Sequence, residues 1–197
     1  MNESDPRNAR AGDALLIVDV QHDFLPGGSL AVPDGARVIA PLRHCAALFA
    51  GRALPVFATR DWHPRDHCSF RPQGGPWPAH CVAGTTGAAF AEALQLPAAT
   101  RIVSKGTHAD HEAYSGFAGT DLERRLSDGA VRRLFVGGLA TDYCVAQTVQ
   151  DARQRGFDVV VLRDAIAAVD AHPGDGEHAI ERMAQLGAVF LDSAELS

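Results

Sequence analysis

Cysteine is scarce in this chain, and long apolar runs are missing. Four cysteines stand among 197 residues, with no Cys-x-x-Cys pair, so we expect neither a disulfide framework nor a zinc finger. No apolar run approaches the roughly 18 residues of a membrane-spanning helix, and the polar residues 1–10 lack the apolar core of a secretory signal. These absences predict a cytoplasmic protein with no membrane partner.

Two further absences exclude whole classes of ligand. The formal charge is −6 and no basic stripe is present, which argues against nucleic acid as a partner. The chain has no Gly-x-Gly-x-x-Gly after a strand-like run, no Walker A sequence and no Gly-x-Ser-x-Gly elbow. The obvious dinucleotide, phosphate-loop and serine-hydrolase interpretations are therefore excluded.

The chain does have a regular alternation of short apolar runs and helical stretches. The runs are rich in Val, Ile, Leu and Phe, do not alternate with polar residues, and cover residues 14–20, 54–59, 101–104, 134–136, 158–162 and 188–191. Such runs are typical of strands buried on both faces of a parallel sheet. Strand followed by helix, repeated, predicts right-handed βαβ units.

Helical signals lie between these runs, over residues 36–50, 120–126, 143–155 and 178–186. Thr120 with Glu123 three residues later has the pattern of a capping box, and Gly156 and Gly187 have the position of C′ glycines. The predicted fold class is α/β: a single domain with a six-stranded, mostly parallel sheet and helices on both faces, in three α/β/α layers. We assign residues 12–197 to this domain and residues 1–11 to a flexible N-terminal tail.

Reactive side chains stand at the ends of the apolar runs. In open α/β sheets, ligands bind outside the carboxyl ends of the strands. The first run ends at Asp19, the second leads to Asp61 and His63, the third to Lys105, and the fourth to a helix that opens at Cys144. Residues far apart in the sequence are thereby predicted to converge at one edge of the sheet.

Cys144 follows a glycine-rich turn and begins a predicted helix. The positive end of a helix lowers the pKa of a thiol and favours the nucleophilic thiolate, and backbone N–H groups of the turn could hold an oxyanion. The alternative is a buried structural cysteine, the commoner fate of a free cysteine, which suits Cys45 in its apolar helix. Position alone leaves both interpretations of Cys144 open.

Asp19 and Lys105 have a catalytic and a plain interpretation each. A carboxylate that ends a hydrophobic strand must be paired or protonated, and Asp19 could take the thiol proton and later deliver it to a leaving amine. The alternative, a turn cap, suits Asp23 better. Lys105 could stabilise the carboxylate and the thiolate, and its alternative is an ordinary surface lysine.

A long loop, residues 61–87, is rich in Pro, Gly, His and Trp, and loops of this length inside a domain are usually functional. Asp61, His63 and His80 offer one oxygen and two imidazoles, and three protein ligands with open positions are typical of a catalytic metal site. Zinc, iron and manganese are all admissible. We interpret His67 as a neighbour of the ligands or a wall of the substrate pocket. The alternative for each histidine is a backbone hydrogen bond.

Four sequence blocks together carry a resemblance to a known family. They are Val18-Asp-Val-Gln-His-Asp-Phe24; Thr59-Arg-Asp-Trp-His-Pro64 with Gly74-Gly-Pro-Trp-Pro-Ala-His80; Val103-Ser-Lys105 with Tyr114-Ser-Gly-Phe117; and Gly138-Leu-Ala-Thr-Asp-Tyr-Cys144. In their order and spacing the chain resembles the nicotinamidase branch of the isochorismatase-like cysteine hydrolases, from about residue 13 to residue 191.

The resemblance implies roles for particular residues. It implies a catalytic triad of Asp19, Lys105 and Cys144, and a metal held by Asp61, His63 and His80. The N–H groups of Ala140 and Cys144 would form an oxyanion hole. The implied aromatic substrate pocket is formed by Phe24, Trp77, Tyr114 and Leu30. It also implies a cis peptide between Leu139 and Ala140. In some relatives another metal ligand follows the first histidine, and His67 and Ser69 lie in that region.

The reaction that the resemblance implies is hydrolysis of nicotinamide to nicotinate and ammonia through a Cys144 thioester, in NAD salvage. The cofactor is one divalent metal ion, with zinc favoured, that binds the pyridine nitrogen, and pyrazinamide is a further expected substrate. Two alternatives stay open: an amidase of the same superfamily that acts on another small amide or ureide, and a non-catalytic module that binds metal or pyridine. A homo-oligomer is also compatible with the sequence.

Overall fold

A computed structural model describes residues 5–197 of the chain. One sheet of six parallel strands runs in the order β3-β2-β1-β4-β5-β6. The strands are β1 (Asp13–Val18), β2 (Val56–Asp61), β3 (Arg101–Lys105), β4 (Arg133–Leu139), β5 (Asp158–Ala167) and β6 (Val189–Leu191). All strand pairs are parallel, so the predicted α/β fold with a mostly parallel sheet is confirmed and the sheet is wholly parallel.

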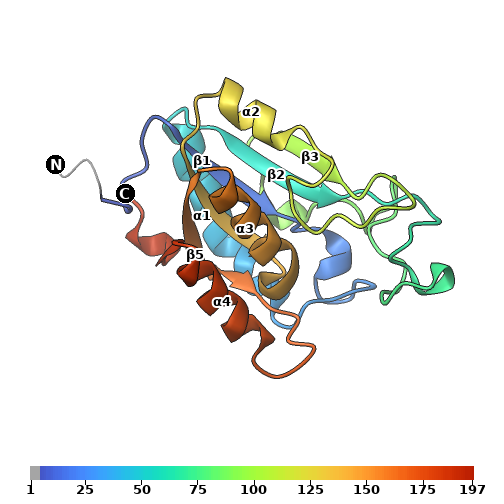
Figure 1. The fold of residues 1–197 in the computed structure, drawn as a ribbon. Coiled ribbons are helices and arrows are strands. Elements are labelled where there is room, and N and C mark those ends of the chain that lie inside the picture. The colour runs from blue at the N-terminus through green and yellow to red at the C-terminus, as the bar shows by residue number, and fades with distance from the viewer. Residues whose placement is uncertain (1–4) are drawn as a thin grey trace.

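Within the described residues, four α-helices cover the sheet, and Figure 1 shows them on both of its faces, in a three-layer arrangement. They are α1 (Ile39–Gly51), α2 (Leu122–Asp128), α3 (Ala146–Gln154) and α4 (Asp175–Gln185). α1 packs with Leu15 and Ile17 of β1 on one face, whereas α2, α3 and α4 pack with Leu16 and Val18 on the other. Because successive side chains of a strand point to opposite faces, the unbroken apolar run of β1 follows from helices on both sides.

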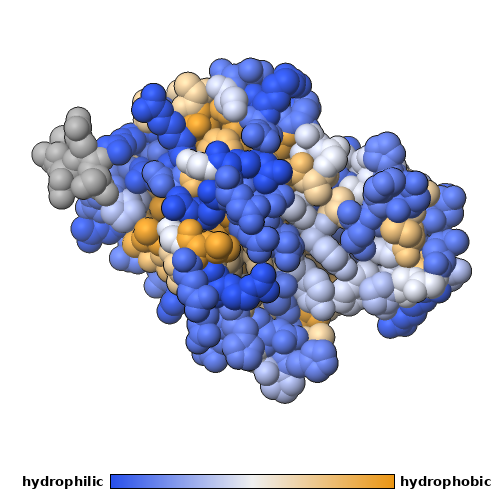
Figure 2. Space-filling model, viewed as in Figure 1, coloured by the Kyte–Doolittle hydropathy of each residue, from blue (hydrophilic) through white to orange (hydrophobic). Residues whose placement is uncertain are grey.

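The surface agrees with this burial. On the face that α3 and α4 cover, hydrophilic residues predominate and apolar atoms emerge only in small patches (Figure 2). Among the described residues, the large apolar side chains that count as exposed are Leu186 at 38% and Val189 at 44%. No helix within residues 5–197 is long and apolar enough to cross a membrane.

Two predictions about helix ends are confirmed and one is wrong. Gly156 and Gly187 follow α3 and α4 with φ angles of +85° and +87°, as expected of C′ glycines. The capping box at Thr120 does not form, because α2 begins only at Leu122 with Asp121 before it. The Thr120 hydroxyl instead donates to the Gly116 carbonyl oxygen at 2.6 Å.

The predicted tail, residues 1–11, lies partly outside the described residues. Within the described part, Ala9 N–H donates to the Ser197 carbonyl oxygen at 3.3 Å, and Ser197 N–H donates to the Arg7 carbonyl oxygen at 3.0 Å. The flexibility of residues 1–11 and the domain boundary at residue 12 stay predictions.

Gly138 provides a test of how closely β1 and β4 pair. It lies opposite Val18 with φ +133°, and a Cβ there would stand 2.0 Å from the Val18 carbonyl oxygen. We expect Gly138→Ala to lower the free energy of unfolding by more than about 2 kcal/mol, because two backbones cannot give way cheaply. Urea unfolding measures this. Gly51→Ala is the control, since its Cβ would meet nothing within 4 Å, and equal stability of the two variants would contradict the expectation.

Candidate active site

The reactive side chains converge at the carboxyl ends of four neighbouring strands. Asp19 directly follows β1, Asp61 ends β2, Lys105 ends β3, and Cys144 lies in the turn of π-helix after β4 (Thr141–Val145). These strands are adjacent in the order β3-β2-β1-β4, so sequence separations of 39 to 44 residues collapse to direct contacts. The predicted convergence at one edge of the sheet is confirmed.

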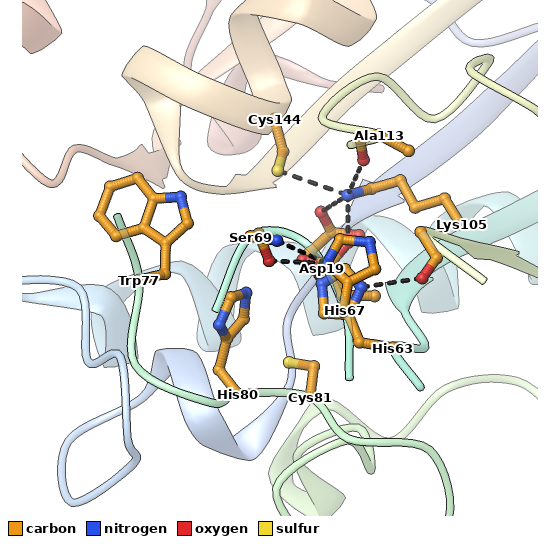
Figure 3. A network of polar contacts seen from close by, with 12 residues as sticks. Asp19, His63, His67, Ser69, Trp77, His80, Cys81, Lys105, Ala113 and Cys144 are labelled. Atoms are coloured by element: carbon orange, nitrogen blue, oxygen red, sulfur yellow. Dashed lines mark hydrogen bonds and ion pairs between the residues drawn. The ribbon is translucent and has the colours of Figure 1, made fainter. Parts of the chain in front are cut away.

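Lys105 is the hub of these contacts (Figure 3). Its ammonium nitrogen lies 2.9 Å from Asp19 Oδ2, donates to the Ala113 carbonyl oxygen at 3.1 Å and lies 3.4 Å from Cys144 Sγ. It also forms an ion pair with Asp61. The side chain is fully buried, so the alternative of a surface lysine is wrong. Burial lowers the pKa of Lys105, but the Asp19 and Asp61 carboxylates outweigh it and hold the net pKa well above its usual value.

Asp19 is buried within reach of the thiol. A carboxylate oxygen of Asp19, one of Asp61 and Cys144 Sγ all lie within 4.8 Å of one another. The Thr59 hydroxyl donates to Asp19 Oδ1 at 2.7 Å. Burial raises the pKa of Asp19, against the pull of Lys105. A more basic carboxylate is better matched to a thiol proton, so the position and the pKa of Asp19 both suit a general base.

Cys144 differs from the sequence expectation in one respect. Burial raises the pKa of its thiol well above the usual value, and Lys105 only partly opposes this. The lowered pKa expected from a helix start is therefore wrong, because desolvation of the anion and the nearby Asp19 and Asp61 carboxylates outweigh the attraction of Lys105. The resting side chain is a thiol, and a base must remove its proton before it can attack a substrate.

Asp61, His63 and His80 form a second cluster, whose ligand atoms lie within 4.8 Å of one another. His63 Nδ1 pairs with the Gly106 carbonyl oxygen at 2.9 Å and His80 Nδ1 with that of Pro78 at 2.8 Å. A carbonyl oxygen can only accept, so both bonds use the Nδ1–H, and Nε2 is the ring nitrogen that could bind an ion. His63 Nε2 lies 3.5 Å from Asp61 Oδ2.

These three residues fit a divalent metal ion. Metal-binding histidines characteristically donate their other ring N–H to a carbonyl or carboxylate, as both do here. Burial lowers the pKa of His80, which keeps its ring neutral and able to coordinate. For Asp61, burial raises the pKa, but Lys105 and His63 outweigh it and the net pKa is lowered. The set thus supplies one anionic oxygen and two imidazole nitrogens, the donors that zinc prefers.

His67 is not among the three ligand residues of this cluster, and its ring is hydrogen-bonded to Ser69. His67 Nδ1 pairs with Ser69 Oγ at 2.7 Å, and His67 Nε2 with the His111 carbonyl oxygen at 3.1 Å. The ring packs on His63 with 4.0 Å between ring centroids. His67 therefore supports His63, and it is absent from the residues that line the substrate pocket.

A pocket opens over the two clusters, and Asp61, His80 and Cys144 are part of its lining. Its lining contains all four residues that the resemblance implies for substrate binding, which are Phe24, Leu30, Trp77 and Tyr114. The other lining residues are Val32, Asp61, His80, Glu112, Ala140, Tyr143, Cys144 and Val169. The Trp77 indole N–H donates to the Tyr114 hydroxyl at 3.0 Å. The Leu139–Ala140 peptide is cis, as the resemblance implies.

Sequence reasoning missed two residues that shape this site. Tyr143 lines the pocket edge-on to Trp77, at 5.2 Å between ring centroids. Its place directly before Cys144 was the available signal. Thr59 binds Asp19, and the sequence indicated this role only by placing a polar residue in an apolar run.

Comparison with known proteins gives the family. The Isochorismatase domain model matches residues 13–195. A nicotinamidase of Escherichia coli K12 is 36% identical to the chain, over 92% of this chain and 95% of the relative. The solved pyrazinamidase of Pyrococcus horikoshii, in complex with zinc, is 45% identical with a TM-score of 0.88, covering 92% of this chain and 99% of that one. PnC1 of L. infantum, solved with nicotinate, is 38% identical with a TM-score of 0.84, covering 95% and 96%. The chain belongs to the isochorismatase family of hydrolases.

Proposed function

We propose that this chain is a nicotinamidase, which hydrolyses nicotinamide to nicotinate and ammonia in NAD salvage. The observation that carries the proposal is that Cys144 lies beside Lys105 and Asp19 and lines an aromatic-walled pocket. A buried thiol beside a buried carboxylate and lysine suits covalent attack on an amide. The choice of nicotinamide as the substrate is supported by the relatives named nicotinamidase and by the related structure solved with nicotinate.

The reaction begins with proton transfer from the Cys144 thiol to Asp19. The thiolate attacks the carboxamide carbon, and its C–S bond forms as the carbonyl π electrons move to oxygen. The N–H groups of Ala140 and Cys144 hold this oxyanion. Asp19 then gives the proton to the amide nitrogen and the C–N bond breaks. Ammonia departs, and a thioester remains on Cys144.

Hydrolysis of the thioester uses the same base. Asp19 takes a proton from water, the resulting hydroxide attacks the thioester carbon, and the C–S bond breaks. Asp19 returns its proton to the sulfur to restore the thiol, and the carboxylic acid product ionises to nicotinate. Lys105 stays protonated throughout, since Asp19 and Asp61 hold its pKa high. Its positive charge stabilises whichever of Asp19 and Cys144 is negative.

Substrate orientation falls to the pocket walls and the metal cluster. Asp61, His63 and His80 would hold a divalent ion, which when bound supplies a Lewis acid for the ring nitrogen of the substrate. We propose zinc, with iron and manganese also admissible. Phe24 and Trp77 flank the aromatic ring, and pyrazinamide, which shares the ring shape and the carboxamide, is a proposed second substrate. We also propose a cytoplasmic location, on the sequence grounds given above.

The test of the proposed function is release of ammonia from nicotinamide by the purified protein. Pyrazinamide and a small ureide are offered in parallel. We expect turnover of nicotinamide and pyrazinamide with at most weak turnover of the ureide. No ammonia above background from nicotinamide would contradict the proposal, and preferred release from the ureide would favour another amidase of the same family.

Metal removal gives a separate prediction. We expect treatment with a strong chelator to reduce ammonia release by about 100-fold, because a substrate ring held about 1 Å out of place loses that much rate. Activity should return when single metals are added back, and the metal that restores most identifies the preferred ion. Unchanged activity in protein shown to be metal-free by elemental analysis would contradict a role for the metal.

A further inference from the structure

Three alternate residues of the segment after β1 point into three different parts of the site. Asp19 faces Lys105 and Cys144, as described above. Gln21 and Asp23 have no place in the mechanism, yet Gln21 is fully buried. A buried polar side chain must be hydrogen-bonded, so its partners indicate what it does.

Gln21 holds the main chain of Asp61 on both sides. Its Oε1 accepts from Asp61 N–H at 2.8 Å, and its Nε2 donates to the Asp61 carbonyl oxygen at 2.8 Å and to that of Ala88 at 2.9 Å. These bonds fix both backbone groups of one residue, and thereby the direction in which its carboxylate projects. Asp61 is shared between Lys105 and the metal cluster, so a small rotation of its backbone changes the position of the ligand oxygen.

Asp23 does the same for the segment that carries His80. Its Oδ2 accepts from Cys81 N–H at 2.7 Å, and Oδ1 from Ser29 N–H at 3.3 Å. Cys81 has φ +45°, a left-handed conformation that is uncommon for a residue with a side chain. The charge-assisted bond from Asp23 stabilises this turn directly after the ligand His80.

We propose that Gln21 and Asp23 are positioning residues that build the metal site from outside. Gln21 fixes the backbone of Asp61, and Asp23 fixes the backbone next to His80. The inference rests on the proposed ligand set of Asp61, His63 and His80. Metal ligands must lie within about 0.2 Å of their ideal distances, and loss of a partner beyond the ligands typically weakens metal binding 10- to 100-fold. A single five-residue segment, Asp19 to Asp23, thus organises both the triad and the metal cluster.

The test measures metal affinity of the full chain without any substrate. Gln21→Met keeps the length of the side chain and removes all three hydrogen bonds. We expect it to raise the dissociation constant for Zn²⁺ by roughly 10- to 100-fold, measured by competition with a chromophoric chelator. The visible absorption of bound Co²⁺ should also change in position or intensity, because the ligand geometry is altered.

The matched control is Arg133→Met, which breaks the pair between Arg133 and Asp13 at the opposite end of β1. It is expected to cost stability and to leave the Zn²⁺ constant and the Co²⁺ spectrum unchanged. A purely structural role for Gln21 would make both variants behave alike.

Asp23→Asn provides a second, milder variant in case Gln21→Met does not fold. The amide keeps one acceptor oxygen but loses the charge, so we expect at least about a threefold weaker Zn²⁺ affinity. Affinities within twofold of the wild type in the folded variants would overturn the inference. Failure of the wild type itself to bind Zn²⁺ would overturn the proposed ligand set instead, which separates the two outcomes.

Discussion

Replacement of Cys144 by alanine is expected to reduce ammonia release from nicotinamide by at least about three orders of magnitude. Cys144 lines the pocket, and its sulfur lies 3.4 Å from Lys105 Nζ and within 4.8 Å of an Asp19 oxygen. Without the sulfur no thioester forms, and only uncatalysed attack by water remains. The measurement is kcat and KM for nicotinamide in a coupled ammonia assay.

The control for this variant is the same substitution at another buried cysteine. Cys45 lies in α1, and burial raises its pKa to about 12, which disfavours the reactive thiolate. It is not among the residues that line the pocket. Cys45→Ala is expected to keep the wild-type kcat with some loss of stability. Cys144→Ala should still bind nicotinamide in calorimetry. If the Cys144→Ala variant kept a wild-type kcat, the covalent mechanism would be wrong. If the wild-type protein bound nicotinamide without turnover, the chain would be a binding module.

Asp19→Asn is expected to have the second largest effect, a loss of about 10²- to 10⁴-fold in kcat/KM. The asparagine oxygen can still accept from the Thr59 hydroxyl, as Asp19 Oδ1 does at 2.7 Å, so the fold should survive. The amide cannot take the thiol proton, however, and burial holds the Cys144 pKa high. Alkylation of Cys144 by iodoacetamide should therefore slow together with the enzymatic rate.

The aspartate at the opposite end of β1 is the matched control. Asp13 begins β1, pairs with Arg133 and is also buried, but it lies at the end of the sheet away from the pocket. Asp13→Asn is expected to lower the unfolding midpoint and to leave kcat/KM and the alkylation rate near wild type. An Asp19→Asn enzyme with near-normal alkylation and turnover would show that another group removes the proton.

Strand existence was predictable, whereas strand length was not. β1 and β2 were found from unbroken apolar runs, which follow from burial on both faces. β4 extends through Gly137 and Gly138 to Leu139, although two glycines in a row are typical of a turn. The close pairing of Gly138 with Val18 explains this, and only the neighbouring strand reveals it. Likewise the charged residues Arg163 and Asp164 end the apolar run of β5, yet the strand continues past them to Ala167.

The candidate site shows the same division. The order of reactive residues along the chain predicted that Asp19, Lys105 and Cys144 converge, because parallel strands place their carboxyl ends at one edge; the resemblance to the family implied their roles. The thiol pKa could not be found that way: it depends on how completely water is excluded, and burial reverses the shift expected from the helix start. Thr59 and Tyr143 were missed because their roles arise from contacts with residues distant in the sequence.

The sequence by itself determined the fold class and the family, and it predicted the residues that we propose carry the chemistry. Hydrophobic patterning specifies burial, and strand ends specify where polar groups gather. Only the tertiary structure decided how those groups influence one another: that Lys105 is buried among two carboxylates and a thiol, and that Gln21 binds the backbone of Asp61. Distances between side chains 40 residues apart depend on sheet register and packing, and desolvation depends on every neighbour at once, so neither can be read from a local pattern.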